Sequence, residues 1–162
     1  MRTLSLSFGV SLPTAHHRES QLMSKRPIWF IVLAAVALLW NLAGLAAVVG
    51  DLQLSATDIE ALPPSQQAFY HARPVWSVFA SLLAVVGGVL GCVGLLLRKR
   101  WALIVLYASL LGIVVQDAGL ILVSRVAGPM ETVPIVLQSS VFVLGIGLVL
   151  LARLALRRTW LT

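Results

Sequence analysis

Residues 74–124 read PVWSVFASLLAVVGGVLGCVGLLLRKRWALIVLYASLLGIVVQDAGLILVS, two apolar runs separated by a short basic stretch. The runs cover 74–97 and 101–124, and each exceeds the roughly 20 residues that a helix needs to cross the core of a bilayer. The basic residues 98–100 leave room only for a tight turn between them. This stretch therefore predicts two antiparallel transmembrane helices.

Two further apolar runs flank this pair, at 28–49 and 134–156. The chain of 162 residues is 59% hydrophobic and 11% charged, and its mean hydropathy is +0.97. Soluble proteins are about half apolar and about a quarter charged, so a soluble domain of this length could not bury so much apolar surface. The sequence predicts an all-α fold, a four-transmembrane-helix bundle over residues 27–158 in contact with the lipid bilayer.

The segments outside the spans complete the organisation. Residues 50–73 form a longer loop between the first and second helices, in which 55–62 has the pattern of a short capped helix that a Pro-Pro pair ends. Residues 1–26 are polar and lack periodicity. We interpret them as a disordered cytoplasmic tail or, equally, we expect translation to start at Met23, with residues 1–22 an extension upstream of the true start.

The distribution of lysine and arginine predicts the orientation. The tail, the basic turn and the C-terminal end hold ten of the 12 basic residues: Arg2, Arg18, Lys25, Arg26, Arg98, Lys99, Arg100, Arg153, Arg157 and Arg158. The other two loops hold only Arg73 and Arg125. Because lysine and arginine concentrate on the cytoplasmic side, we expect both termini inside and the loop 50–73 outside. The net charge of +6 is then explained by topology, and we expect no nucleic-acid partner.

Small residues predict how the helices pack. They form a stripe along the second span: Ala80, Ala84, Gly87, Gly88 and Gly91. Shorter stripes occur in the first span, at Ala34, Ala37, Asn41 and Gly44, and in the third, at Ser109, Gly112, Gln116 and Gly119. Lipid gives helices no hydrophobic reason to associate, so close contact at small residues must do it. We expect an intimate bundle whose glycine faces could also serve a homo-oligomer.

Four polar residues within the spans are candidates for lining a solute site: Asn41, Gln116, Asp117 and Gln138. At about 1.5 Å of rise per residue, all four lie in the outer half of the membrane. A carboxylate at mid-helix costs roughly 2.5–3.5 kcal/mol on insertion scales, which favours a functional role for Asp117. One interpretation is a shared polar cavity that opens outward. The other is structural hydrogen bonding for the three amides, with Asp117 protonated or paired with Arg125 or Arg73.

The sequence lacks the motifs of catalysis and cofactor binding. Its three histidines, His16, His17 and His71, lie outside the spans and so cannot ligate a haem within the bundle. The single cysteine, Cys92, excludes a CxxC pair, and the HExxH, GxSxG and phosphate-binding patterns are missing. We therefore expect no enzyme, no metal site and no cofactor.

Three stretches carry a resemblance to a known family: RPIWF…ALLWNLAG, LPPSQQAFYHARPVW and LLLRKRWA. Over residues 26–158 the chain resembles small bacterial four-helix membrane proteins that carry the label "sugar transporter". The resemblance rests on Trp40-Asn41 in the first helix, on the aromatic entry to the glycine-rich second helix, and on Gln116. Asp117 is not part of the family pattern. The resemblance implies a bacterial cytoplasmic (inner) membrane protein that transports sugars.

Our functional expectation combines these observations. We expect a transporter of a small polar solute of the sugar type, and four helices enclose so little space that transport would need an oligomer. The alternative is an accessory or structural membrane protein that binds a partner through the outer loop 50–73. A transporter should need Asn41, Gln116 or Asp117, whereas an accessory protein should tolerate apolar residues in their place.

Overall fold

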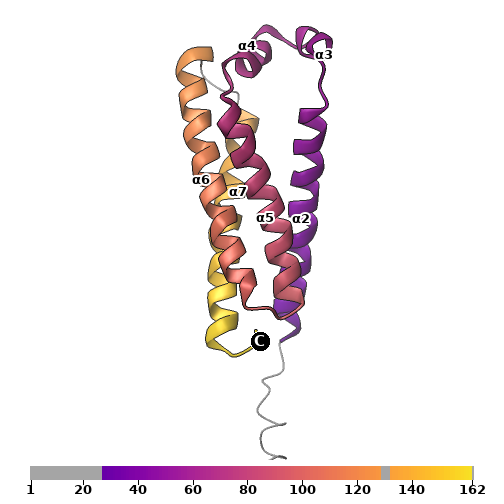
Figure 1. The fold of residues 1–162 in the computed structure, drawn as a ribbon, viewed down its shortest axis with the longest axis vertical. Helices are drawn as coiled ribbons and strands as arrows, with labels where there is room; N and C mark the ends of the chain where they lie inside the picture. Colours follow the sequence, from indigo (N-terminus) through magenta and orange to yellow (C-terminus); the bar gives the residue numbers. More distant parts are fainter. Residues whose placement is uncertain (1–26, 129–131, 162) are drawn as a thin grey trace, which may run out of the picture.

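The computed structural model describes residues 27–128 and 132–161, which form an elongated helical bundle (Figure 1). Its four long helices are α2 (Ile28–Leu52), α5 (Val75–Leu96), α6 (Trp101–Ala127) and α7 (Thr132–Arg157). Two short helices, α3 (Ala56–Glu60) and α4 (Pro64–Ala72), connect α2 to α5. All four long helices are long and apolar enough to cross a membrane. The all-α fold and the four apolar helices are therefore confirmed. The interpretation of residues 1–26 lies outside the described residues.

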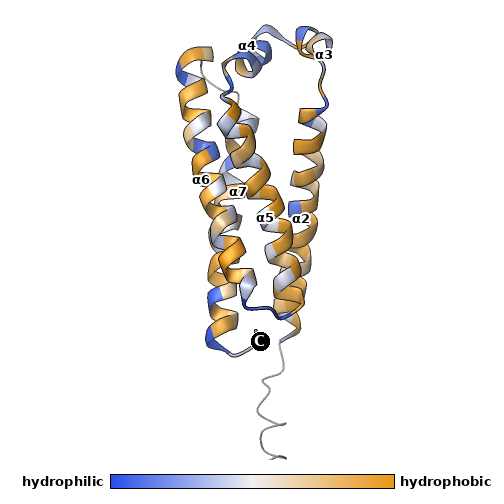
Figure 2. Ribbon diagram, viewed as in Figure 1, coloured by the Kyte–Doolittle hydropathy of each residue, from blue (hydrophilic) through white to orange (hydrophobic). Residues whose placement is uncertain are grey.

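Hydrophilic residues gather at the two ends of the bundle, and the lengths of the long helices are mainly apolar (Figure 2). One end holds the start of α2, the turn between α5 and α6 and the end of α7, and the other holds α3 and α4 (Figure 1). We call these the terminal half and the loop half. Which half faces the cytoplasm stays a prediction from the charge distribution.

Local chemistry explains where the helices begin and end. Ser55 caps α3 in a capping box, in which its hydroxyl accepts from the Asp58 amide while the Asp58 carboxylate accepts from the Ser55 amide. Helix α4 begins at Pro64 itself, with Pro63 as its N-cap, because a proline at the first helical position lacks only an amide that would have no partner there. The proline pair therefore both ends α3 and begins α4.

The basic turn between α5 and α6 closes with a left-handed residue. Arg98 has φ 64°, and the Lys99 amide donates to the Gly94 carbonyl at 2.8 Å, which satisfies a carbonyl at the end of α5. The Arg98 side chain then donates through Nε to the Trp160 carbonyl at 3.0 Å. The turn is thereby tied to the C-terminal end of α7.

Small residues bring α5 and α6 into close contact. The stripe of α5 that the sequence singled out is buried along its whole length: Ala80, Ala84, Gly87, Gly88 and Gly91. From the other side, Gly112 of α6 lies so close that a Cβ atom there would be 2.8 Å from the Ala84 amide nitrogen and 2.9 Å from the Ala80 carbonyl oxygen. Only glycine fits this crossing, because the obstructing atoms belong to the backbone.

The packing differs between the two halves of the bundle. A buried cluster fills the terminal half and draws on all four long helices: Phe30, Ala34, Cys92, Leu95, Ala102, Leu106, Leu148, Val149, Ala152, Ala155, Trp160 and Leu161. Over their whole lengths α2 packs mainly on α5, and α7 packs mainly on α6, while α2 and α7 touch each other little. The space that is left between the helices of the loop half holds the candidate site.

Candidate functional site

Three cavities lie around the polar residues of the spans, and the central one extends to Leu106 and Leu148 of the terminal cluster. The lateral groove, of about 560 Å³, runs between α6 and α7 and is lined by Asp117, Leu120, Ile121, Ser124, Ile135, Gln138, Ser139, Phe142 and Val143. The loop-end pocket, of about 160 Å³, is lined by Phe69, Arg73, Ser77, Ser81, Gln116, Gly119, Leu120, Val123, Pro134 and Gln138. The central cavity, of about 230 Å³, is lined by Trp40, Asn41, Gly44, Ala47, Val48, Ala84, Val85, Leu106, Ser109, Ile113, Gln116, Gln138, Val141, Leu144, Gly145 and Leu148.

Gln138 lines all three cavities and joins two polar residues of α6. Its Nε2 donates to Asp117 Oδ1 at 2.5 Å, and its Oε1 accepts from Gln116 Nε2 at 3.1 Å. The hydrogen bonds therefore run in one direction: Gln116 donates to Gln138, and Gln138 donates to Asp117. We call these three residues the polar cluster.

The polar cluster contains three of the four residues that the sequence placed at a solute site. Gln116 and Asp117 are neighbours in α6 but their side chains lie on different faces of that helix, so a single partner on α7 is needed to connect them. Gln138 supplies that connection. Because the three side chains lie where the cavities meet, they can offer hydrogen bonds in more than one direction.

Asn41 lies apart from the polar cluster. Its Nδ2 donates to the Ala37 carbonyl of its own helix at 2.8 Å and to Cys92 Sγ at 3.9 Å. Its Oδ1 covers Gly88, where a Cβ atom would come within 1.9 Å of it. Asn41 therefore packs α2 against α5, although it shares the central cavity with Gln116 and Gln138.

The Asp117 carboxylate has no cationic partner among the described residues. Its hydrogen bond comes from Gln138, and the arginine at the loop end, Arg73, forms its ion pair with Asp51 instead. A carboxylate has two oxygens and about four acceptor positions, and Gln138 occupies one of them. The pairing of Asp117 with Arg73 or Arg125 that the sequence left open is thus replaced by a hydrogen bond to an amide.

The loop end contains an interaction that the sequence did not predict. Asp51, at the end of α2, accepts from the Tyr70 hydroxyl at 2.5 Å and pairs with the Arg73 guanidinium. Burial, followed by the hydrogen bond from Tyr70 to Asp51, raises the pKa of Tyr70 to about 12. These three residues, which we call the loop clasp, tie α2 to the start of α5. The available signal was Arg73, the one arginine or lysine of a loop that holds three acidic residues.

The polar cluster can make hydrogen bonds to a ligand. The polar cluster provides one carboxylate and two amides, which accept and donate hydrogen bonds. Within residues 27–128 and 132–161, no group of three or more histidine, cysteine, aspartate or glutamate side chains could hold a metal ion.

Comparisons with protein-family models, with curated proteins and with solved structures gave no match. The structure itself shows an integral, multi-pass membrane protein of four apolar helices, with a hydrogen-bonded polar cluster where its cavities meet.

Proposed function

We propose that this protein binds and translocates a small solute at the polar cluster, as a carrier in a bacterial cytoplasmic membrane. The observation that supports the proposal is the position of Gln138, which lines three cavities while it connects Gln116 to Asp117. A polar chain whose only role was to hold two helices together would not need open space on several sides.

The cost of the polar cluster supports a binding role. Inter-helical hydrogen bonds in membranes average about 0.6 kcal/mol, whereas inserting one aspartate at the helix centre costs roughly 2.5–3.5 kcal/mol. The hydrogen bonds within the cluster therefore do not offset the cost of Asp117. A solute that uses the remaining acceptor positions of the carboxylate would account for its retention.

The difference in packing between the terminal half and the loop half indicates the end from which a solute would enter. At the terminal end, the rings of Phe30 and Trp160 lie 5.4 Å apart and those of Trp29 and Trp160 lie 5.9 Å apart, which closes this end of the bundle. The cavities lie toward the loop end, where α2 and α7 touch little. A solute would reach the polar cluster from the loop end, and release on the other side would require the terminal aromatic contacts to open.

The volume of the central cavity indicates how a solute could be enclosed. The central cavity, at about 230 Å³, is smaller than the roughly 300–1,000 Å³ that small-molecule sites usually occupy. A homo-oligomer that adds walls from a second copy would enlarge it. Sugars are the first solutes to test, because the family that the chain resembles implies them.

The test is solute uptake into proteoliposomes and into a deletion strain, with a panel of labelled sugars. Asp117→Asn keeps the shape and the hydrogen bond but removes the charge, so uptake should fall while expression and thermal stability hold. Asp117→Leu should abolish uptake and insert more easily. Ser140→Ala is the matched control, because the Ser140 hydroxyl bonds to the Val136 carbonyl of its own helix and lines none of the three cavities. Wild-type uptake by Asp117→Leu would disprove the proposal.

The alternative is an accessory protein that binds a partner through the loop 50–73. It draws on one observation: α3 and the first turn of α4 are largely exposed at the loop end, whereas the second half of α4 is half-buried. Replacing the exposed residues of α3 should then abolish function, and Asp117→Leu should leave it intact. The carrier proposal expects the opposite pair of results.

A further inference from the structure

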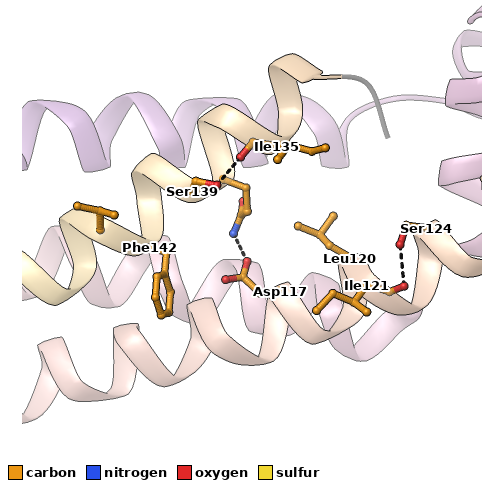
Figure 3. Close-up of a pocket in the computed structure, with 9 residues that line it drawn as sticks. Asp117, Leu120, Ile121, Ser124, Ile135, Ser139 and Phe142 are labelled. Atoms are coloured by element: carbon orange, nitrogen blue, oxygen red, sulfur yellow. Dashed lines mark hydrogen bonds between the residues drawn. The ribbon is translucent and has the colours of Figure 1, made fainter. Parts of the chain in front are cut away.

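The lateral groove differs from the other two cavities because it opens on the outer flank of the bundle. Its walls are apolar side chains of α6 and α7, and several of them remain exposed at the surface that faces lipid: Ile121 is 56% exposed and Val143 is 66% exposed. Asp117 lies between the two helices and points toward α7, with Phe142 on one side and Leu120 and Ile121 on the other (Figure 3). A ligand could therefore enter this groove sideways, from the bilayer.

The charge in the lateral groove is a single carboxylate. Asp117 is the one ionisable residue among the nine that line it, and the others are apolar residues, two serines and Gln138. The hydroxyls of Ser124 and Ser139 already donate to the carbonyls of Ile121 and Ile135 in their own helices. The nearest basic group that lines a neighbouring cavity is Arg73, which Asp51 holds in the loop clasp.

Together, these features select a class of ligand. We propose that the lateral groove binds a hydrophobic organic cation, whose charged centre pairs with Asp117 and whose apolar body lies between α6 and α7. An ion pair gains strength where water is scarce, and Gln138 holds the carboxylate in place by donating to Oδ1. Phe142 adds an aromatic face, which attracts cations within about 6 Å of the ring centre.

The same features distinguish a cation from the other occupants of a membrane groove. A lipid acyl chain would contact the apolar walls but would leave the carboxylate unpaired. A sugar would find few free hydrogen-bond donors, since both serine hydroxyls are occupied by their own helices. Charge complementarity and apolar walls together therefore favour a cation with an apolar body. This inference rests on the proposed carrier function, because it names the class of solute that the polar cluster would take.

The test compares two ions that match in size and shape but differ in charge. Labelled tetraphenylphosphonium and labelled tetraphenylborate are titrated against the purified full-length protein in detergent, where no membrane potential acts. The phosphonium should bind at least about tenfold more tightly than the borate, a difference of about 1.4 kcal/mol. Equal binding of the two ions, or tighter binding of the borate, would overturn the inference.

Variants locate the binding to the groove. Asp117→Asn should weaken phosphonium binding about tenfold or more and leave borate binding unchanged, since it removes the charge and keeps the volume. Asp117→Glu should retain binding, and Ser140→Ala, outside the groove, should bind like the wild type. If Asp117→Asn failed to fold, Phe142→Leu would provide the second test, because loss of the ring should weaken phosphonium binding severalfold. Wild-type affinity in a folded Asp117→Asn or in Phe142→Leu would contradict the proposal.

Binding and transport are then separated in proteoliposomes. Phosphonium binding that depends on Asp117, without any flux of the phosphonium, would support the site and disprove the carrier function. Uptake of a sugar that depends on Asp117, together with equal binding of the two ions, would support the carrier and disprove the cation site. The two proposals therefore fail in different ways.

Discussion

The two halves of the bundle are built for different purposes. In the terminal half, all four long helices meet around a buried cluster, and Arg98 ties the α5–α6 turn to the carbonyl of Trp160. In the loop half, cavities remain between the helices, and polar side chains lie within the span. One half resembles a protein core and the other resembles a binding site.

The difference shows how a small membrane protein can combine stability with a polar interior. Lipid offers helices no hydrophobic gain on association, so van der Waals contact between closely fitting surfaces must hold them together. That contact is closest along the small-residue faces of α5 and α6, and at the terminal end the rings of Phe30 and Trp160 add to it. The loop half then tolerates gaps and a carboxylate, and the loop clasp adds to the packing of Asn41 on Gly88 in keeping α2 near α5. Sites that must change shape are generally drawn from such less stable regions.

The first prediction concerns which half faces outward, and its expected effect is all or none. In a cysteine-free background, Ser65→Cys in α4 should react with a membrane-impermeant maleimide in intact spheroplasts. Lys99→Cys, in the turn of the terminal half, should react only after lysis. The reason is the ten-to-two distribution of basic residues between the two sides. The reverse labelling pattern would put the cavities on the cytoplasmic side.

The second prediction tests whether the terminal half carries the stability. Phe30 is fully buried between Trp29 and Trp160, so Phe30→Ala should lower the free energy of unfolding by about 3–5 kcal/mol through the cavity that it leaves. Phe142→Ala in the lateral groove is the control, because that ring is 36% exposed and already borders open space. Reversible unfolding in mixed micelles measures both. Equal losses would mean that the two halves are equally packed.

The third prediction concerns glycines at and away from the crossing of α5 and α6. Gly112→Ala should cost about 1–3 kcal/mol, because its Cβ would meet the backbone of α5 at Ala80 and Ala84. Gly147→Ala should be neutral or stabilising by up to about 1 kcal/mol, since nothing lies within 4 Å of its Cβ and alanine favours the helix. Thermal unfolding of the two variants gives the comparison. A stable Gly112→Ala would show that the helices can move apart without loss.

The sequence was sufficient for the architecture because membrane insertion leaves a strong pattern. Long apolar runs and charged ends predict helices regardless of how they pack, and the four helices and the all-α fold are confirmed. The burial of Gly88 and Gly91 was predictable in the same way, because a small residue every three or four positions indicates a helix face that packs closely on another helix in lipid. Periodicity thus identified the helices and the face of α5 that packs.

The candidate site was less accessible to sequence reasoning, because it depends on contacts between helices. The sequence placed Gln116, Asp117 and Gln138 at a similar depth, but nothing in it showed that Gln138 would donate to Asp117 while accepting from Gln116. It also grouped Asn41 with them, although Asn41 bonds its own helix and Cys92. Depth follows from counting residues, whereas the rotation of each helix about its axis follows from packing.

The last prediction, with the smallest expected effect, tests the loop clasp. The Tyr70 hydroxyl donates to Asp51, so Tyr70→Phe should lower the free energy of unfolding at neutral pH by about 0.5–1.5 kcal/mol. The folded state raises the pKa of Tyr70 from 10.0 to about 12, which means that it favours the protonated hydroxyl. That contribution is complete below pH 10 and is lost as the pH rises to about 12. The difference in stability between the wild type and Tyr70→Phe should therefore shrink across this interval.

Tyr107→Phe, in the terminal half, is the control, because its ring packs under Arg153 and keeps that contact without the hydroxyl. A difference that stays constant from pH 9 to pH 12 would show that the hydroxyl of Tyr70 does not hold the clasp, and that within the clasp the Asp51–Arg73 ion pair acts without it.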